Sequence, residues 1–311
     1  MKNKIKRGVS LTLVACAALS LFSFGASAEA GAHQTPFSVE ERATYDMLAR
    51  VELGLLPVGS RSVSAYRTLS VSYNGRALKS GAISVGGRAY ISLREFSRLV
   101  GADYSYDSVS KTATVRYGGF TLSVNDGAYV MYANYSRPIF SFSNSVLMSD
   151  GAVYSPLDSL VRAFGLSSDS SSGGVALSGS PRPMSQKAPY SEDEVFWLAR
   201  IIQAESSGES LLGKIGVGSV VMNRVASPLY PNTIYGVIFD KNYGVQFSPI
   251  LNGTIYNTPN YQSRLAAMIC LEGFRISDRA LFFLEPRLAT SSWIPRNREY
   301  LFSILHHDFY A

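Results

Sequence analysis

One glutamate stands where a carboxyl group has chemical consequences. In the stretch 191–218, apolar side chains recur at helical spacing at Val195, Leu198 and Ile202. Glu205 occupies the next position on that face. Burial raises the pKa of a carboxyl group, and the negative end of a helix dipole does the same. A carboxylic acid that stays protonated near neutral pH is what general acid catalysis needs. The alternative is a glutamate at a helix end that extends into water.

Helix signals surround this position. Ser191 and Glu194 have the spacing of a capping box, which predicts that a helix begins directly after Ser191. Three acidic residues fill its first turn, where the helix dipole favours negative charge. Gly208 breaks the pattern, so Glu205 is expected close to a turn and to an open cleft. A second helix is expected over 210–224, and its glycines predict close packing against another backbone.

Other kinds of site fit the residues poorly. Residues 208–214 match the phosphate-loop pattern G-x-x-x-x-G-K, but Ile215 follows where Ser or Thr should hold magnesium, and no strand precedes the loop. The histidines of the chain are His33, His306 and His307. They support neither a zinc site nor a Ser-His-Asp triad, because ligands and a serine elbow are missing. Cys270 lies in an apolar run and is predicted to be a buried thiol. No metal or other cofactor is expected.

The first 28 residues have the features of a secretion signal. Four basic residues are followed by an apolar run and by a small-x-small cleavage site that ends at Ala28. The alternatives are an uncleaved membrane anchor and a lipoprotein signal at Cys16. This segment contains four of the 29 basic residues and no acidic residue, so the remaining chain is only slightly basic. It has no basic block that would indicate nucleic-acid binding, and no transmembrane run after residue 28.

Residues 68–178 are predicted to form a β-rich domain. Short alternating strands recur in it, and Asn74-Gly75 is a hairpin signal. A pattern of four residues occurs twice, 64 positions apart and each time beside a short amphipathic helix, which indicates an internal repeat. The matched positions are Gly87, Tyr90, Leu93 and Gly101 in one copy and Gly151, Tyr154, Leu157 and Gly165 in the other. Before this domain, a helix is expected within the segment 29–67.

The residues before each of these helices read Tyr90-Ile-Ser-Leu93 and Tyr154-Ser-Pro-Leu157. They resemble the copper amine oxidase N-terminal-like domain, whose usual pattern is tyrosine-valine-proline-leucine. This segment contains no histidine, which copper sites in proteins favour, so we expect no copper in it. We interpret the domain as a binding domain for a cell wall polymer. A purely structural spacer is the alternative.

A linker rich in Ser, Gly and Pro at 179–189 leads into a second domain at 190–311. After its first two helices, Asn232 or Thr233 is expected to cap a short helix that ends near Phe239. The order of elements expected beyond it is a hairpin over 243–256 with its turn at Asn252-Gly253, a helix from a Thr258 cap and Pro259 to Gly273, and a buried strand over 280–284.

Four segments of this second domain carry a further resemblance. They read WLARIIQAESSGE, GKIGVGSVVMNRVASPLYPNTIYGVIF, QFSPILNGTIYNTPN and ALFFLEPRLATSSWI. Over about 192–310 the chain resembles the cell wall hydrolase family of spore cortex-lytic enzymes, SleB type. The resemblance implies a lysozyme-like fold, lytic transglycosylase activity on peptidoglycan and a single catalytic glutamate at Glu205. The family usually reads glutamate-alanine-arginine-glycine-glutamate-proline, whereas this chain lacks the arginine and reads Glu205-Ser-Ser-Gly-Glu209-Ser.

The resemblance also suggests which side chains surround the acid. Gln246 and Phe247, on the expected hairpin, would line a substrate groove. Tyr243, Asn223 and Trp293 are further candidates for substrate binding, although each of these residues would equally fit a core or a turn. Glu209 is expected to support the site by capping or orienting the second helix.

Length and composition complete the prediction. The chain has 311 residues, 46% of them hydrophobic and 17% charged, which suits about two globular domains. We predict an α+β protein with an α-rich, lysozyme-like catalytic domain that contains a small β-hairpin, preceded by the β-rich domain. It is expected to be secreted, to associate with the cell wall or spore, and to act on peptidoglycan glycan strands. The alternatives are a muramidase-type hydrolase that uses water and a non-catalytic scaffold that binds the wall.

Overall fold

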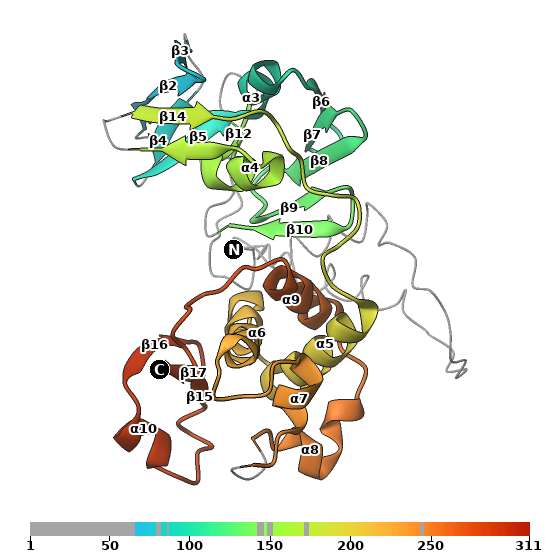
Figure 1. Ribbon diagram of the computed structural model, residues 1–311, viewed down its shortest axis with the longest axis vertical. Coiled ribbons are helices and arrows are strands. Elements are labelled where there is room, and N and C mark those ends of the chain that lie inside the picture. Colours follow the sequence, from blue (N-terminus) through green and yellow to red (C-terminus); the bar gives the residue numbers. More distant parts are fainter. Residues whose placement is uncertain are drawn as a thin grey trace, which may run out of the picture. The chain divides into compact units, whose positions relative to one another are not determined.

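The computed structural model describes residues 66–78, 82–85, 87–141, 146–147, 152–170, 174–242 and 246–311. The predicted signal segment 1–28 and almost all of the segment 29–67 lie outside these residues, as do Gly151 and Tyr243. Helices and strands both occur in the described part, so the mixed α+β class is confirmed (Figure 1). No helix of the described residues is both long and apolar enough to cross a membrane.

Strands dominate the described residues up to Ser178. One sheet has the order β1 (Arg67–Thr68), β4 (Ala82–Val85), β5 (Arg88–Ser92), β12 (Val153–Pro156) and β11 (Val146–Leu147). A second has the order β10 (Arg137–Phe140), β9 (Val130–Ala133), β8 (Phe120–Asn125), β7 (Thr112–Tyr117) and β6 (Asp103–Asp107). A third has the order β13 (Ser167–Asp169), β14 (Gly174–Ser178), β2 (Ser70–Tyr73) and β3 (Arg76–Ala77).

The predicted turn at Asn74-Gly75 is confirmed. It joins β2 to β3, and both of its residues have positive φ, 48° at Asn74 and 79° at Gly75. Such values are those of the two-residue hairpin that Asn-Gly favours. The strand β14 pairs in parallel with β2, so the last strand of the β-rich region returns to its first strands.

Two short helices, α3 (Leu93–Val100) and α4 (Leu157–Phe164), follow β5 and β12 as the sequence predicts. Each ends at a glycine in the left-handed conformation, Gly101 with φ 72° and Gly165 with φ 60°. Their inner faces share one core, in which the rings of Phe96 and Phe164 meet edge to face with centroids 5.0 Å apart.

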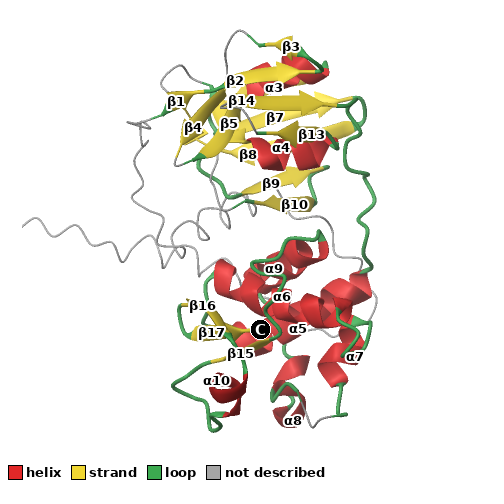
Figure 2. Cartoon of the chain, turned by 60° about the vertical axis from the view of Figure 1, so that its left-hand side comes forward, coloured by secondary structure: helices red, strands yellow, loops and turns green. Residues whose placement is uncertain are grey.

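Helices dominate the described residues after the linker (Figure 2). The long ones are α5 (Glu192–Ser206), α6 (Leu211–Ala226) and α9 (Tyr261–Leu271). The shorter elements are α7 (Ile234–Phe239), α8 (Pro249–Asn252), the 3-10 helix η1 (Thr254–Tyr256), α10 (Trp293–Asn297), and a sheet with the order β15 (Phe282–Leu284), β17 (His307–Tyr310), β16 (Tyr300–Ile304).

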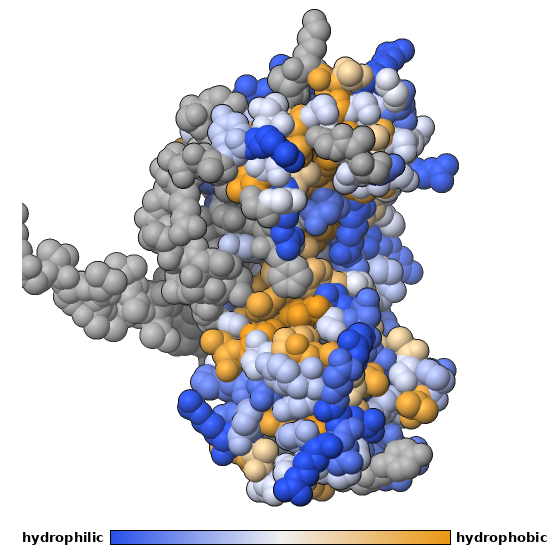
Figure 3. All heavy atoms as spheres, turned by 90° about the vertical axis from the view of Figure 1, so that its left-hand side faces the viewer, coloured by the Kyte–Doolittle hydropathy of each residue, from blue (hydrophilic) through white to orange (hydrophobic). Residues whose placement is uncertain are grey.

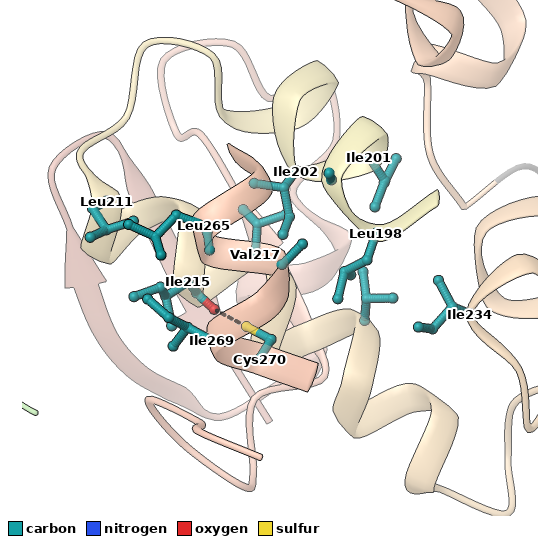
Figure 4. Packing of buried hydrophobic residues seen from close by; sticks show 14 of the residues in the cluster. Leu198, Ile201, Ile202, Leu211, Ile215, Val217, Ile234, Leu265, Ile269 and Cys270 are labelled. Carbon is teal, nitrogen blue, oxygen red and sulfur yellow. Dashed lines mark hydrogen bonds between the residues drawn. The ribbon is translucent and has the colours of Figure 1, made fainter. Parts of the chain in front are cut away.

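The core of this helical region forms where α5, α6 and α9 pack together (Figure 4). Cys270 is fully buried there, as predicted, with its Sγ 3.6 Å from the Ile215 carbonyl oxygen. The glycines of α6 do mark close packing, but against side chains rather than the expected backbone. A Cβ on Gly216 would lie 2.6 Å from the Phe309 ring, and one on Gly218 would lie 2.7 Å from Cys270 Sγ.

Three local predictions are wrong in the helical region. The hairpin expected over 243–256 is absent, because its described residues form α8 and η1 instead. Pro249 opens α8, and Gly253, with φ 78°, ends it. The cap of α9 is Asn260, whose side chain accepts from the Ser263 amide, and not Thr258. The strand expected over 280–284 is present as β15, but its residues are only half-buried.

Candidate active site

Glu205 lies at the penultimate position of α5. The predicted capping box is present: Ser191 Oγ accepts from the Glu194 amide at 3.2 Å, and the Glu194 carboxylate accepts from the Ser191 amide at 2.8 Å. The side chains of Val195 and Ile202 are buried along the same helix. The register set by this cap places Glu205, half-buried, where the apolar face ends.

Burial has the expected electrostatic effect. It raises the pKa of Glu205 from 4.5 to about 7, and the positive charge of Arg224 acts in the opposite direction. The carboxyl group is therefore protonated in about half of the molecules at neutral pH, and in most of them below it. A group with this pKa can donate a proton and then accept one back near physiological pH.

The end of α5 is held by a buried lysine. Lys214 Nζ donates to the carbonyl oxygens of Ser206 at 2.6 Å, Ser207 at 3.1 Å and Glu209 at 2.6 Å. A cation at a helix C-terminus also interacts favourably with the helix dipole. Lys214 is the lysine of the G-x-x-x-x-G-K pattern, and its residue is only 1% exposed. Lys214 therefore donates to the backbone just after Glu205 and does not bind a phosphate as the pattern would suggest.

Glu209 links the turn after α5 to the C-terminal strands. Its Oε1 lies 2.8 Å from His306 Nδ1 and 3.9 Å from His307 Nδ1, and its side chain is only 4% exposed. Burial lowers the pKa of His307. The expectation that Glu209 caps α6 is wrong, because Ser210 is the cap and accepts from the Gly213 amide.

Arg224 is a residue that the sequence reasoning missed. Its guanidinium is buried, its Nε donates to the Leu281 carbonyl at 2.9 Å, and its Nη1 has no hydrogen-bond partner in the described part of the chain. Burial lowers its pKa, and the charge of Glu205 counteracts this. The group lies over three rings, those of Tyr230 and Phe247 at 5.2 Å each and Phe282 at 5.6 Å. A charged residue inside the apolar run VVMNRV was the available signal.

The predicted substrate-binding residues have different surroundings. Trp293 opens α10 and is half-exposed, and Gln246 is half-buried in the segment before α8. Phe247 is only 2% exposed, so it lies in the core beside Arg224 and not on a groove surface. Asn223 donates to the carbonyl oxygens of Ser277 and Ala280, both at 2.8 Å, which commits its amide to a loop. It also lines a surface hollow of about 660 Å³ with Arg275 and Asp278. Tyr243 lies outside the described residues.

The described residues contain no group of three His, Cys, Asp or Glu side chains arranged to hold a metal ion. The histidines of the chain all lie outside the β-rich segment.

Two segments of the chain match known family models. Residues 208–310 match the family described as Cell Wall Hydrolase, and residues 72–175 match the Copper amine oxidase N-terminal domain. Both resemblances inferred from the sequence are therefore confirmed. The cell wall hydrolase match begins at Gly208, within the turn that follows α5, so Glu205 lies just before the matched residues.

Individual relatives agree with the first of these families. A spore cortex-lytic enzyme of Bacillus cereus is 37% identical over 105 residues, which are 34% of this chain and 39% of that protein. The spore cortex-lytic enzyme of Bacillus subtilis (strain 168) is 35% identical over 105 residues, 34% of this chain and 33% of that protein. The chain therefore spans about two fifths or less of the length of these relatives.

Solved structures of catalytic domains are also similar. The catalytic domain of the germination-specific lytic transglycosylase SleB from Bacillus anthracis is 34% identical, with a TM-score of 0.37, and the match covers 40% of this chain and 99% of that domain. The catalytic domain of the Bacillus cereus SleB protein is 34% identical with a TM-score of 0.36, and the match covers 40% of this chain and 94% of that domain.

Proposed function

We propose that this protein is a lytic transglycosylase that cleaves the β-1,4 bond between N-acetylmuramic acid and N-acetylglucosamine in peptidoglycan. The observation that carries the proposal is the half-buried carboxyl group of Glu205, whose pKa is raised to about 7. The cell wall hydrolase family match and the spore cortex-lytic relatives support the substrate.

The proposed reaction uses one carboxyl group twice. Protonated Glu205 donates its proton to the glycosidic oxygen while the bond from that oxygen to muramoyl C1 breaks, and N-acetylglucosamine leaves with a free 4-hydroxyl. The Glu205 carboxylate then takes the proton of the muramoyl C6 hydroxyl. That oxygen bonds to C1, which closes a 1,6-anhydro ring and returns the proton to the enzyme. No water is consumed, and no second carboxylate is needed as a nucleophile.

The state of the neighbouring acids favours this single-carboxyl mechanism. Glu209 is engaged by His306, and Asp240 accepts from the Asn242 amide at 3.0 Å. Each of these carboxylates therefore has a structural contact of its own. Arg224 is positioned to stabilise the negative charge of Glu205 after its proton has left.

We also propose the organisation of the chain around this domain. The signal segment 1–28 would direct secretion to the wall or spore, the β-rich domain at 68–178 would bind a wall polymer, and the linker 179–189 would join it to the lysozyme-like domain at 190–311. The equal lengths of α3 and α4, and the left-handed glycine after each, support two copies of one unit. Gln246 and Trp293 remain our candidates for substrate contact.

A digest of purified peptidoglycan tests the function. We expect the wild-type protein to release muropeptides with anhydro ends, which are lighter by one water than reducing ends. Glu205→Gln should abolish the release while the fold is retained. Glu192→Gln, an exposed glutamate of the same helix, is the matched control and should remain active. Reducing ends in the product would establish a hydrolase, and no release by the wild type would favour a scaffold.

A further inference from the structure

A row of aromatic rings and guanidinium groups extends from the protein surface to Arg224. The Arg298 guanidinium carbon lies 4.5 Å from the centroid of the Phe282 ring and 5.1 Å from that of Trp293. The two rings meet edge to face with centroids 6.4 Å apart. Arg224 lies 5.6 Å from the centroid of the same Phe282 ring. The Phe282 ring therefore contacts two guanidinium groups, the buried one of Arg224 and the exposed one of Arg298.

Local hydrogen bonds fix the outer part of this row. Arg298 ends α10, and its amide donates to the Ile294 carbonyl at 2.9 Å. The Asn297 side chain donates to the Trp293 carbonyl at 2.8 Å. These two bonds hold the short helix so that Trp293 at its start and Arg298 after its end face the same ring. The arrangement is set by the backbone and needs little ordering when a ligand binds.

The outer arginine is available for an anion. Arg298 is exposed, and its guanidinium has no hydrogen-bond or ion-pair partner among the residues that the structure describes. Its neighbour Glu299 pairs with Arg279 at 2.5 Å instead. Stacking covers the faces of a guanidinium but leaves its N–H edge free, and this edge matches a carboxylate with two parallel hydrogen bonds.

Trp293 supplies the second half of a binding surface. Its side chain is 51% exposed beside the cation. Exposed aromatic rings that also carry a polar edge suit ligands with both apolar faces and polar groups, which is the character of a sugar ring. The face that bears α10 and β16 mixes strongly hydrophilic and hydrophobic residues (Figure 3). This mixture fits a glycan with charged substituents better than a purely apolar partner.

We propose that Trp293, Phe282 and Arg298 form a subsite for a muramoyl unit that carries a peptide, with Arg298 holding a carboxylate of that peptide. This proposal rests on the proposed function, because that function supplies the anionic glycan. Trp293 stacks on the sugar, and Phe282 keeps Arg298 in place. Arg224 lies over the same Phe282 ring and its charge acts on Glu205, so Arg224 links the subsite to the proposed acid.

The test varies the arginine and the substrate carboxylates together. Peptidoglycan freed of phosphate polymers is used either native or with its carboxylates converted to neutral amides by carbodiimide and methylamine. On native substrate, Arg298→Ala should lower kcat/KM about tenfold, the effect expected for one charge-assisted hydrogen-bonded pair. On amidated substrate, wild type and Arg298→Ala should be equal. Arg296→Ala, an exposed arginine within α10, is the matched control and should behave as wild type on both.

Two further measurements distinguish a failure of the subsite from a failure of the proposed function. Trp293→Ala should weaken activity on both substrates, because stacking does not depend on the carboxylates. Co-sedimentation with the two substrates, in a Glu205→Gln background, measures binding without turnover. If Arg298→Ala binds or cleaves native substrate as well as the wild type, or loses as much on both substrates, the subsite is overturned. An inactive wild type would refute the proposed function, while the co-sedimentation still decides the subsite.

Discussion

Replacing Glu205 by glutamine should stabilise the protein at alkaline pH while it removes activity. The native state holds the Glu205 proton more tightly than the unfolded chain, because burial raises the pKa of this group from 4.5 to about 7. Unfolding therefore releases a proton in this pH range, and the wild type loses stability as the pH rises through it. Glutamine has nearly the same shape but cannot ionise, so the variant lacks this loss.

The size of the effect follows from the pKa. One pKa unit corresponds to about 1.4 kcal/mol, so the shift of Glu205 costs the wild type up to about 3 kcal/mol at pH 8. At pH 5 the native carboxyl is already protonated. The free energies of unfolding of wild type and Glu205→Gln should then differ by less than about 1 kcal/mol. For a domain of about 120 residues, about 3 kcal/mol corresponds to a difference of about 10–15 °C in Tm.

The measurement is thermal unfolding of wild type and Glu205→Gln at pH 5 and pH 8, with Glu192→Gln as control. We expect the Tm of Glu205→Gln to exceed that of the wild type at pH 8 and to approach it at pH 5. Glu192 is exposed, so the Tm of Glu192→Gln should stay close to that of the wild type at both pH 5 and pH 8. A difference between Glu205→Gln and wild type that is the same at both pH values would refute the claim that burial holds this carboxyl protonated.

Three further substitutions have defined outcomes. Lys214→Met leaves three carbonyl oxygens, two of them buried and one partly buried, without their donor and should lower the free energy of unfolding by about 3 kcal/mol, measured by denaturant titration. Gly216→Ala places a methyl group 2.6 Å from a ring and should cost about 1–3 kcal/mol, whereas Gly208→Ala, with open space around it, should cost far less. Arg224→Met removes the cation that lowers the pKa of Glu205, so the alkaline limb of kcat should move up by about one pH unit. Arg224→Lys should leave that limb near its wild-type position, and an unmoved limb in the methionine variant would contradict the proposed coupling.

Local signals in the sequence were sufficient for the elements that they define completely. The capping box at Ser191 predicts α5 and, through helical spacing, the half-buried position of Glu205. Asn74-Gly75 predicts its hairpin because few residues tolerate positive φ at both positions of that turn. These elements depend on residues close together in the chain, so the pattern carries the information.

Contacts between residues far apart in the sequence could not be predicted from local patterns. His306 and Glu209 lie 97 residues apart in sequence, and no local pattern indicates that they meet. In the sequence, Arg224 is simply one charged residue of a helix. Only the fold brings the rings of Phe247 and Phe282 next to its guanidinium. The Asn252-Gly253 signal failed because Pro249 starts a helical turn, and the glycine then ends that turn instead of a strand.

The ring of Phe309 against Gly216 has a consequence for the order in which the protein is made. The helix α6 emerges from the ribosome long before β17, yet the surface around Gly216 is covered only when Phe309 arrives. Until then the chain exposes an apolar strip on α6 and lacks the contact between His306 and Glu209 near the end of α5. The helical region therefore completes its fold late, after synthesis has passed residue 309. A chaperone that binds apolar segments would find its site on α6 during that interval, and the finished fold would remove it.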